Sequence, residues 1–298
     1  MKFKESKIIK NFDYPVACQD MHLSESGNFL ASVGTYKPSV KIHDLVNIAQ
    51  KSDRHLESDA LKILSLTKNC EKLALLRVDR YIEFHVKYGM HERIRVPKMC
   101  YDLKMNNFNA NLLACGKSPD IYRFDLLEGR FVESYKTNLQ KIMSCDINNV
   151  HGLIGYCGDK KIEFIDQRSE EIISTVEDED LVNLSFSENG LNFATGSAPG
   201  QVKIFDLRSK KELNIYAHKE SIRKIKMVGK SVVSVDKEEV IIFSENEIID
   251  RINVECPINT FDILGGVIFL GLDDLNMRTF YCSDFGFIPD WFRAIKVE

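Results

Sequence analysis

One short sequence pattern recurs at a regular interval along nearly the whole chain. In its clearest copy, residues 202–207 (VKIFDL), apolar and polar side chains alternate before a turn-forming Asp. Altered copies lie about 40 residues apart, at residues 40–45, 81–86, 121–126, 161–166, 240–244 and 277–282. Such alternation is typical of a strand with one buried face. The chain is therefore expected to repeat one small β unit roughly seven times.

A period near ~40 residues is that of one four-stranded blade of a β-propeller. Each unit divides into an inner strand, a second strand, the recurring third strand and an outer fourth strand. Residues 186–209 resemble the WD-repeat consensus most closely, with Phe205 standing where that consensus usually has Trp. We predict an all-β, seven-bladed WD-repeat β-propeller. It is expected to be a single domain over residues 1–298, with residues 283–298 as a C-terminal tail.

The last unit lacks a fourth strand, because residues 283–289 have the composition of a loop. The N-terminus has one strand to spare, at residues 7–12. We predict that this N-terminal strand pairs into the last blade and closes the ring, which removes an exposed sheet edge.

Composition limits the classes of function. With 44% hydrophobic and 28% charged residues, the 298-residue chain can bury a large core. Its net charge of −4 gives no overall attraction to nucleic acid, so a basic surface has to be local. No segment resembles a signal peptide or a membrane helix, so no contact with a membrane is expected.

No catalytic motif is present. The seven His residues are scattered, and the sequence contains neither HExxH, GxSxG nor a phosphate-binding Gly loop. Eight cysteines without a CxxC pair are typical of reduced thiols. Cys18, Cys100 and Cys145 begin predicted inner strands, where they either ring the central channel or, as packing favours, fill the core. We predict no enzyme, no metal, no cofactor and no small-molecule substrate.

Some polar residues have structural explanations. His218 and Asp236 match the pair that in WD repeats forms a hydrogen-bonded brace between a loop and the following turn. The acidic run at residues 177–180 is either a solvated loop or a docking point for a basic partner.

The densest basic stretch lies between residues 208 and 230. Its candidates for contact with RNA or an acidic partner are Lys210, Lys211, Lys219, Arg223 and Lys224. The alternative is that these charges are only solvated.

Two third strands end in Asp-x-Arg, at residues 166–168 and 206–208. Such tandem endings resemble those of WD-repeat substrate receptors of cullin ubiquitin ligases, which is the alternative function. They are also common in WD repeats generally, because the arginine can bond a neighbouring carbonyl.

Several short sequence segments outside the repeat positions resemble the nucleolar protein 10 family, whose members are WD-repeat components of the small-subunit processome. They occur in order over nearly the entire chain, at residues 11–15, 34–38, 79–85, 89–98, 128–131, 146–153 and 288–291. Members of that family carry a basic extension before the propeller and a long charged region after it. This sequence starts almost at the first strand and stops at Glu298, so we expect either a minimal version of the family or a fragment.

The resemblance implies a scaffold of the nucleus and nucleolus, with no catalytic activity, that supports small-subunit assembly and pre-rRNA cleavage. It also implies partners among other ribosome assembly factors, contact with pre-rRNA, and a monomer within a large ribonucleoprotein. Two of these segments, at residues 34–38 and 79–85, fall in turns at blade ends. They make Tyr36, Lys37, Asp79 and Arg80 candidates for a partner-binding face. The alternative is that Tyr36 and Arg80 brace adjacent blades.

Overall fold

The structure is a computed structural model that describes residues 2–6, 16–158, 160–244 and 247–293. In these residues the strands form seven antiparallel sheets, each 4-stranded, and one short helix follows them. The number and size of the sheets confirm the prediction of a seven-bladed β-propeller. No described helix has the length and apolar character needed to cross a membrane.

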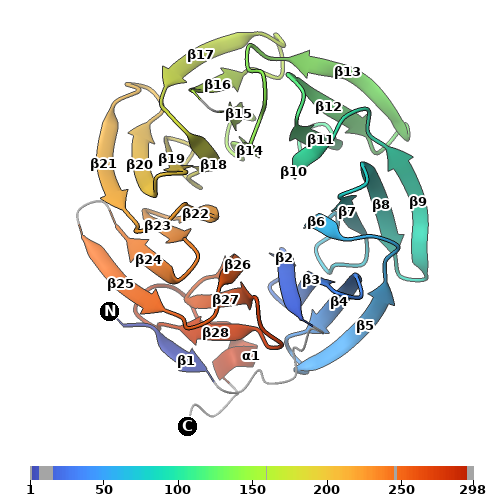
Figure 1. Cartoon of the computed structure of the whole chain (residues 1–298), viewed down its shortest axis with the longest axis vertical. Helices are drawn as coiled ribbons and strands as arrows, with labels where there is room; N and C mark the ends of the chain where they lie inside the picture. The colour runs from blue at the N-terminus through green and yellow to red at the C-terminus, as the bar shows by residue number, and fades with distance from the viewer. Residues whose placement is uncertain (1, 7–15, 159, 245–246, 294–298) are drawn as a thin grey trace. The chain divides into compact units, whose positions relative to one another are not determined.

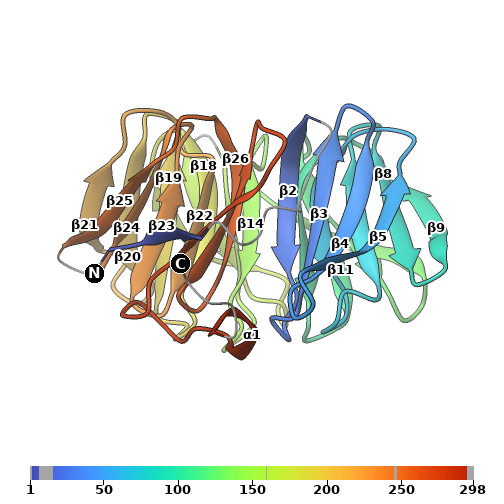
Figure 2. The same cartoon turned by 90° about the horizontal axis from the view of Figure 1, so that it is seen from below.

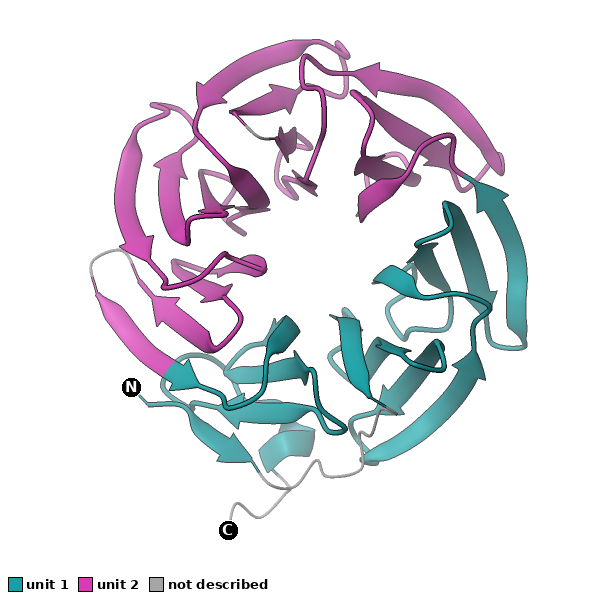
Figure 3. Ribbon diagram, viewed as in Figure 1, with its two compact units in different colours: residues 1–95, 252–298 teal, residues 96–251 magenta. Residues whose placement is uncertain are grey.

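The chain divides into two compact units, which are coloured separately in Figure 3. Unit 1 contains residues 1–95 and 252–298, and unit 2 contains residues 96–251. The prediction of one domain over residues 1–298 stays a prediction, and each unit is described by itself below.

Unit 2 carries four consecutive sheets in which the strands lie in chain order (Figure 1). The first is built of β10 (Cys100–Asn106), β11 (Asn111–Gly116), β12 (Asp120–Asp125) and β13 (Arg130–Lys136). The second is built of β14 (Ser144–Ile147), β15 (Ile154–Cys157), β16 (Lys161–Ile165) and β17 (Ile172–Glu177). The third is built of β18 (Leu181–Phe186), β19 (Asn192–Ser197), β20 (Gln201–Asp206) and β21 (Glu212–Ala217). The fourth is built of β22 (Lys224–Val228), β23 (Ser231–Val235), β24 (Glu239–Phe243) and β25 (Ile248–Asn253).

Unit 1 carries the other three sheets. One is built of β2 (Ala17–Leu23), β3 (Phe29–Thr35), β4 (Ser39–Asp44) and β5 (Ala49–His55). The next is built of β6 (Ala60–Ser65), β7 (Leu73–Arg77), β8 (Tyr81–Val86) and β9 (Gly89–Arg95). The last has the order β1-β28-β27-β26, with β26 (Ile258–Leu264), β27 (Val267–Leu272), β28 (Arg278–Tyr281) and β1 (Lys4–Ser6).

The N-terminal strand completes this last sheet, as predicted. β1 pairs antiparallel with β28, with Lys4 opposite Tyr281 and Ser6 opposite Thr279. The described strand is Lys4–Ser6, and the expected segment, residues 7–12, lies outside the described residues. The polar triplet Lys4–Ser6 has two exposed residues, so it carries no apolar alternation by which the sequence could reveal it.

Deletion of residues 1–6 is expected to lower the free energy of unfolding by roughly 1 kcal/mol, because it removes a short, exposed set of ladder hydrogen bonds. It also uncovers the edge of β28. Urea denaturation measures the loss of stability, and light scattering measures association of the exposed edges. An unchanged unfolding midpoint would show that β1 contributes nothing to stability.

The C-terminal tail is partly an ordered element. Its helix α1 (Asp290–Arg293) lies at the lower end of the strands in Figure 2. The Trp291 indole N–H donates to the Gly27 carbonyl at 3.1 Å, and the Phe292 side chain is only 1% exposed. This segment packs into the core cluster that contains Phe269, so residues 290–293 belong to the fold of unit 1.

The WD-like repeat of unit 2 keeps an aromatic residue at the expected position. Phe205 is buried and stacks on Phe193, with ring centroids 5.1 Å apart and planes at 10°. A stacked phenyl ring therefore occupies the place of the consensus Trp, and it joins β19 to β20 without a buried indole N–H that needs a partner.

Candidate partner-binding surface

The β3–β4 turn presents an aromatic ring and a cation to solvent. Tyr36 and Lys37 have φ angles of 59° and 74°, as in a hairpin turn of type I′, where Asn and Gly are the usual residues. The Tyr36 side chain is 79% exposed, and Lys37 has no ion pair within the described part of the chain. A left-handed backbone at two residues with side chains is unfavourable, and such strain is concentrated at functional sites.

The β7–β8 turn holds the other two predicted residues. Arg80 has a φ of 70° and donates its backbone N–H to the Arg77 carbonyl at 3.3 Å. The Asp79 carboxylate accepts hydrogen bonds from the buried Arg77 guanidinium, one of them at 2.6 Å. Asp79 is therefore fixed by a partner inside its own blade, whereas the Tyr36 side chain is largely exposed to solvent.

Both turns lie at the same end of their sheets, because each joins the second strand of a blade to the third. The segment between β5 and β6 links them. The Leu56 N–H donates to the Pro38 carbonyl at 2.7 Å, and the Val78 N–H donates to the Asp59 carbonyl at 3.0 Å. The four predicted residues thus share one end of unit 1.

This end of unit 1 is hollowed beside the first turn. An open hollow of about 780 Å³ is lined by Val16, Tyr36, Lys37, Pro38 and Asp59. We call the residues Tyr36, Lys37, Asp59, Asp79 and Arg80 the turn surface. It offers a tyrosine ring, two cations and two carboxylates, a composition suited to contact with a protein rather than to chemistry on a small molecule.

A buried charged network that the sequence did not reveal lies beneath the turn surface. The Arg77 guanidinium also contacts the Ser58 hydroxyl at 3.1 Å and the Glu83 carboxylate, and Glu83 contacts His85 at 3.2 Å. Burial lowers the pKa of Arg77, but the hydrogen bonds and charges of Asp79 and Glu83 outweigh burial and raise it. Burial raises the pKa of Glu83, but His85 and Arg77 outweigh it and hold that pKa below its ordinary value. Both groups are therefore ionised.

The structure divides the basic stretch in two. Lys210 and Lys211 lie in the turn between β20 and β21, whereas Lys219, Arg223 and Lys224 lie at the other end of β21. At ~3.3 Å per residue, a strand of this length separates the two groups by about 20 Å. Residues that are close in sequence thus form two small basic groups rather than one patch.

The Asp-x-Arg endings are explained by turn chemistry. The Asp166 carboxylate accepts the Arg168 backbone N–H at 2.9 Å, and Asp206 accepts those of Arg208 and Ser209 at 2.7 and 3.0 Å. Hydrogen bonds from these backbone groups lower the pKa of Asp206. Asp125 closes its turn in the same way with Leu127 in the position of the arginine, so the turn does not require an arginine.

The expected brace at His218 is present in unit 2. Its Nδ1 lies 3.2 Å from Asp236 and its Nε2 lies 2.6 Å from the Ser234 hydroxyl, with all three side chains buried. Burial lowers the pKa of His218, against the opposing effect of Asp236. A neutral, doubly hydrogen-bonded ring serves to join the β21–β22 loop to its blade.

Comparison with known proteins decides the family. The profile of the family described as "Nucleolar protein 10-like, N-terminal domain" matches residues 2–296. The chain belongs to this family. Nucleolar protein 10 of Danio rerio is 28% identical over 96% of this chain and 42% of its own length. Nucleolar protein 10 of Homo sapiens is 28% identical over 96% of this chain and 45% of its own length.

Ribosome biogenesis protein ENP2 of Saccharomyces cerevisiae is a further relative, 27% identical over 96% of this chain and 43% of its own length. The chain thus spans less than half of each of these relatives. The names of these relatives refer to the nucleolus and to ribosome biogenesis, and the profile match confirms the family that the resemblance indicated.

Proposed function

We propose that this chain is a non-catalytic scaffold in the assembly of the small ribosomal subunit and in pre-rRNA processing. It acts as a component of the small-subunit processome and holds other assembly factors. Membership of the nucleolar protein 10 family supports a role in ribosome biogenesis. In the described residues the buried side chains of Glu83 and His85 take part in an ion-pair network and those of His218 and Asp236 form a brace, which supports a binding role rather than catalysis.

The turn surface is the observation that carries the binding role. Tyrosine and arginine are enriched in protein interfaces, and a rigid tyrosine loses little conformational entropy on binding. At Tyr36 and Lys37 the protein tolerates an unfavourable backbone in order to present these side chains. We assign the contact with an assembly factor to this surface, and contact with pre-rRNA to the group formed by Lys219, Arg223 and Lys224.

Replacing Tyr36 by Asn and Lys37 by Glu together is expected to reduce association with assembly factors at least about tenfold, the effect of losing one interface residue worth ~1.4 kcal/mol. Asn accepts the left-handed backbone, so the fold is retained. Affinity purification of the tagged chain from cells, with quantification of bound proteins and pre-rRNA, measures the loss.

A matched control lies at the opposite end of a blade in unit 1. Tyr88 is 78% exposed and follows Lys87, so the double change Tyr88→Asn and Lys87→Glu has the same chemistry at the other end of the strands. The control is expected to retain its partners. Equal retention of partners by both variants would remove the turn surface from the proposal. Recovery of a cullin adaptor in place of pre-rRNA would overturn the proposed function itself.

A further inference from the structure

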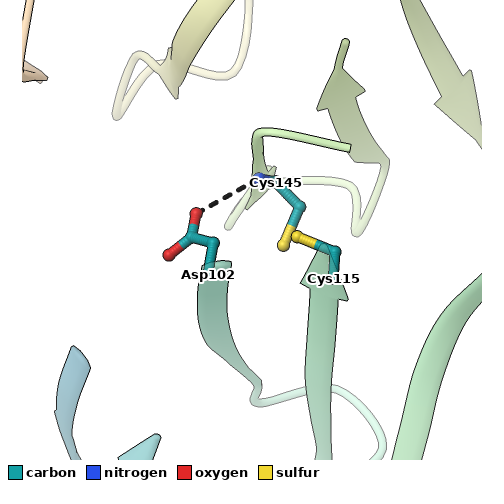
Figure 4. Close-up of side chains that lie close together, drawn as sticks. All are labelled: Asp102, Cys115 and Cys145. Atoms are coloured by element: carbon teal, nitrogen blue, oxygen red, sulfur yellow. Dashed lines mark hydrogen bonds between the residues drawn. The ribbon is translucent and has the colours of Figure 1, made fainter. Parts of the chain in front are cut away.

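Two cysteines and an aspartate meet inside unit 2. Asp102 lies on β10, Cys115 on β11 and Cys145 on β14, so the three residues come from two neighbouring sheets (Figure 4). A carboxylate oxygen and the two sulfur atoms all lie within 4.8 Å of one another, and all three side chains are buried. Figure 4 shows the two sulfur atoms turned toward each other.

The two thiols differ from other buried cysteines in their polar contacts. Cys18 donates to the Asp20 carbonyl at 3.7 Å and Cys100 to the Lys98 carbonyl at 3.6 Å. Cys115 instead lies with its sulfur atom within 4.8 Å of the Cys145 sulfur, in a core cluster of mainly apolar side chains.

The aspartate is held in a fixed orientation. One carboxylate oxygen accepts the Leu103 N–H at 2.9 Å, and the other accepts the Ser144 hydroxyl at 2.8 Å and the Cys145 N–H at 3.2 Å. Hydrogen bonds of this kind orient carboxylates that bind metal ions.

We propose that Asp102, Cys115 and Cys145 form a structural site for a thiophilic divalent cation, Zn²⁺. On binding, the cation replaces the two thiol protons, which pass to solvent, and no electron is transferred. Structural zinc usually has four ligands. Three ligands come from this group, and Cys100, which is buried on β10, lies outside it with its thiol donating to the Lys98 carbonyl at 3.6 Å. The site would join the sheet that begins with β10 to the sheet that begins with β14.

Metal analysis of the intact chain, purified under reducing conditions without a metal-binding tag, tests this site. About one Zn²⁺ per chain is expected, as for a single site with structural affinity. Replacing Zn²⁺ by Co²⁺ is expected to give a thiolate charge-transfer band. The Cys115→Ser, Cys145→Ser variant should lose both the zinc and the band. The Cys18→Ser variant, altered at a buried thiol of unit 1, should keep both.

Ser144→Ala leaves every proposed ligand in place, so it tests the site even where the cysteine variants do not fold. Loss of its hydrogen bond to Asp102 is expected to weaken Zn²⁺ binding by about 10–100-fold in a chelator competition. Two results would overturn the proposal. One is a reduced, folded chain that neither contains Zn²⁺ nor develops the Co²⁺ band. The other is a Cys115–Cys145 disulfide, detected by mass spectrometry in place of the metal.

Discussion

Replacing Glu83 by Gln is expected to lower the free energy of unfolding by about 3 kcal/mol, because it leaves a buried guanidinium without its buried counterion. The side chains of Arg77 and Glu83 are each only 3% exposed. Asp79 and Glu57 still face Arg77, but their side chains are 37% and 69% exposed, so water screens them more strongly. Urea denaturation at neutral pH measures the loss.

A double-mutant cycle separates the ion pair from simple loss of packing. The Arg77→Met, Glu83→Gln variant removes both charges, so it is expected to be more stable than the sum of the two single changes predicts, by about 2 kcal/mol. Glu92→Gln, on the exposed face of β9 in the same sheet, is the control and is expected to stay within ~0.5 kcal/mol of the unaltered chain. Strict additivity of the two single changes would contradict the coupling.

The Glu83→Gln variant also separates the stability of the blade from partner binding. Arg77 holds the Asp79 carboxylate, so the network positions part of the turn surface as well as stabilising the blade. Tyr36 lies in a different sheet, on a turn that this network does not reach. We therefore expect the Glu83 variant, where it is folded, to bind assembly factors better than the variant altered at Tyr36 and Lys37.

The fold was predictable because alternation and spacing are local signals. In residues 202–206 the apolar side chains are buried and those of Lys203 and Asp206 are partly exposed, as their polarity demands, and the repeat then supplies the sheet count. The strand at residues 4–6 was not predicted, because it gives no such signal. Lys4–Ser6 is too short and polar to show alternation, and it gains its place only from β28, more than two hundred residues later in the chain.

The sites were less predictable, because they depend on contacts between distant residues. Tyr36 and Asp79 were found from their turns, but nothing in the sequence showed that Leu56–Pro38 and Val78–Asp59 hydrogen bonds link those turns. The basic residues between 210 and 224 looked like one patch, and an intervening strand separates them.

The cysteine site shows the same limit. Asp102, Cys115 and Cys145 have none of the short spacings of known zinc motifs, and only the pairing of β10 with β11 and the packing of β14 bring them together. The expectation of no metal therefore followed from spacing alone. The fold places Cys18, Cys100 and Cys145 in the strands that begin their sheets and among buried side chains, as the packing alternative predicted.

Acidification is expected to destabilise the protein through His43 of β4, which is fully buried. Burial, together with the charge of Lys41, lowers the pKa of His43 from 6.5 to about 3. The unfolded chain therefore binds a proton near pH 6.5 that the folded chain does not accept until about pH 3. Stability is complete above pH 6.5 and falls as the pH drops below it, by up to about 1.4 kcal/mol per pH unit.

Between pH 7 and pH 5, the free energy of unfolding is expected to fall by about 2 kcal/mol less in the His43→Leu variant than in the unaltered chain. Part of the slope remains, because burial also lowers the pKa of His218. Urea midpoints at the two pH values measure the change, and His55→Gln, at an exposed position of β5, serves as the control. If stability fell as steeply with pH in the Leu variant as in the control, the prediction would be wrong. His43 would then be protonated in the folded protein, or the blade would open to water before the rest of the protein unfolds.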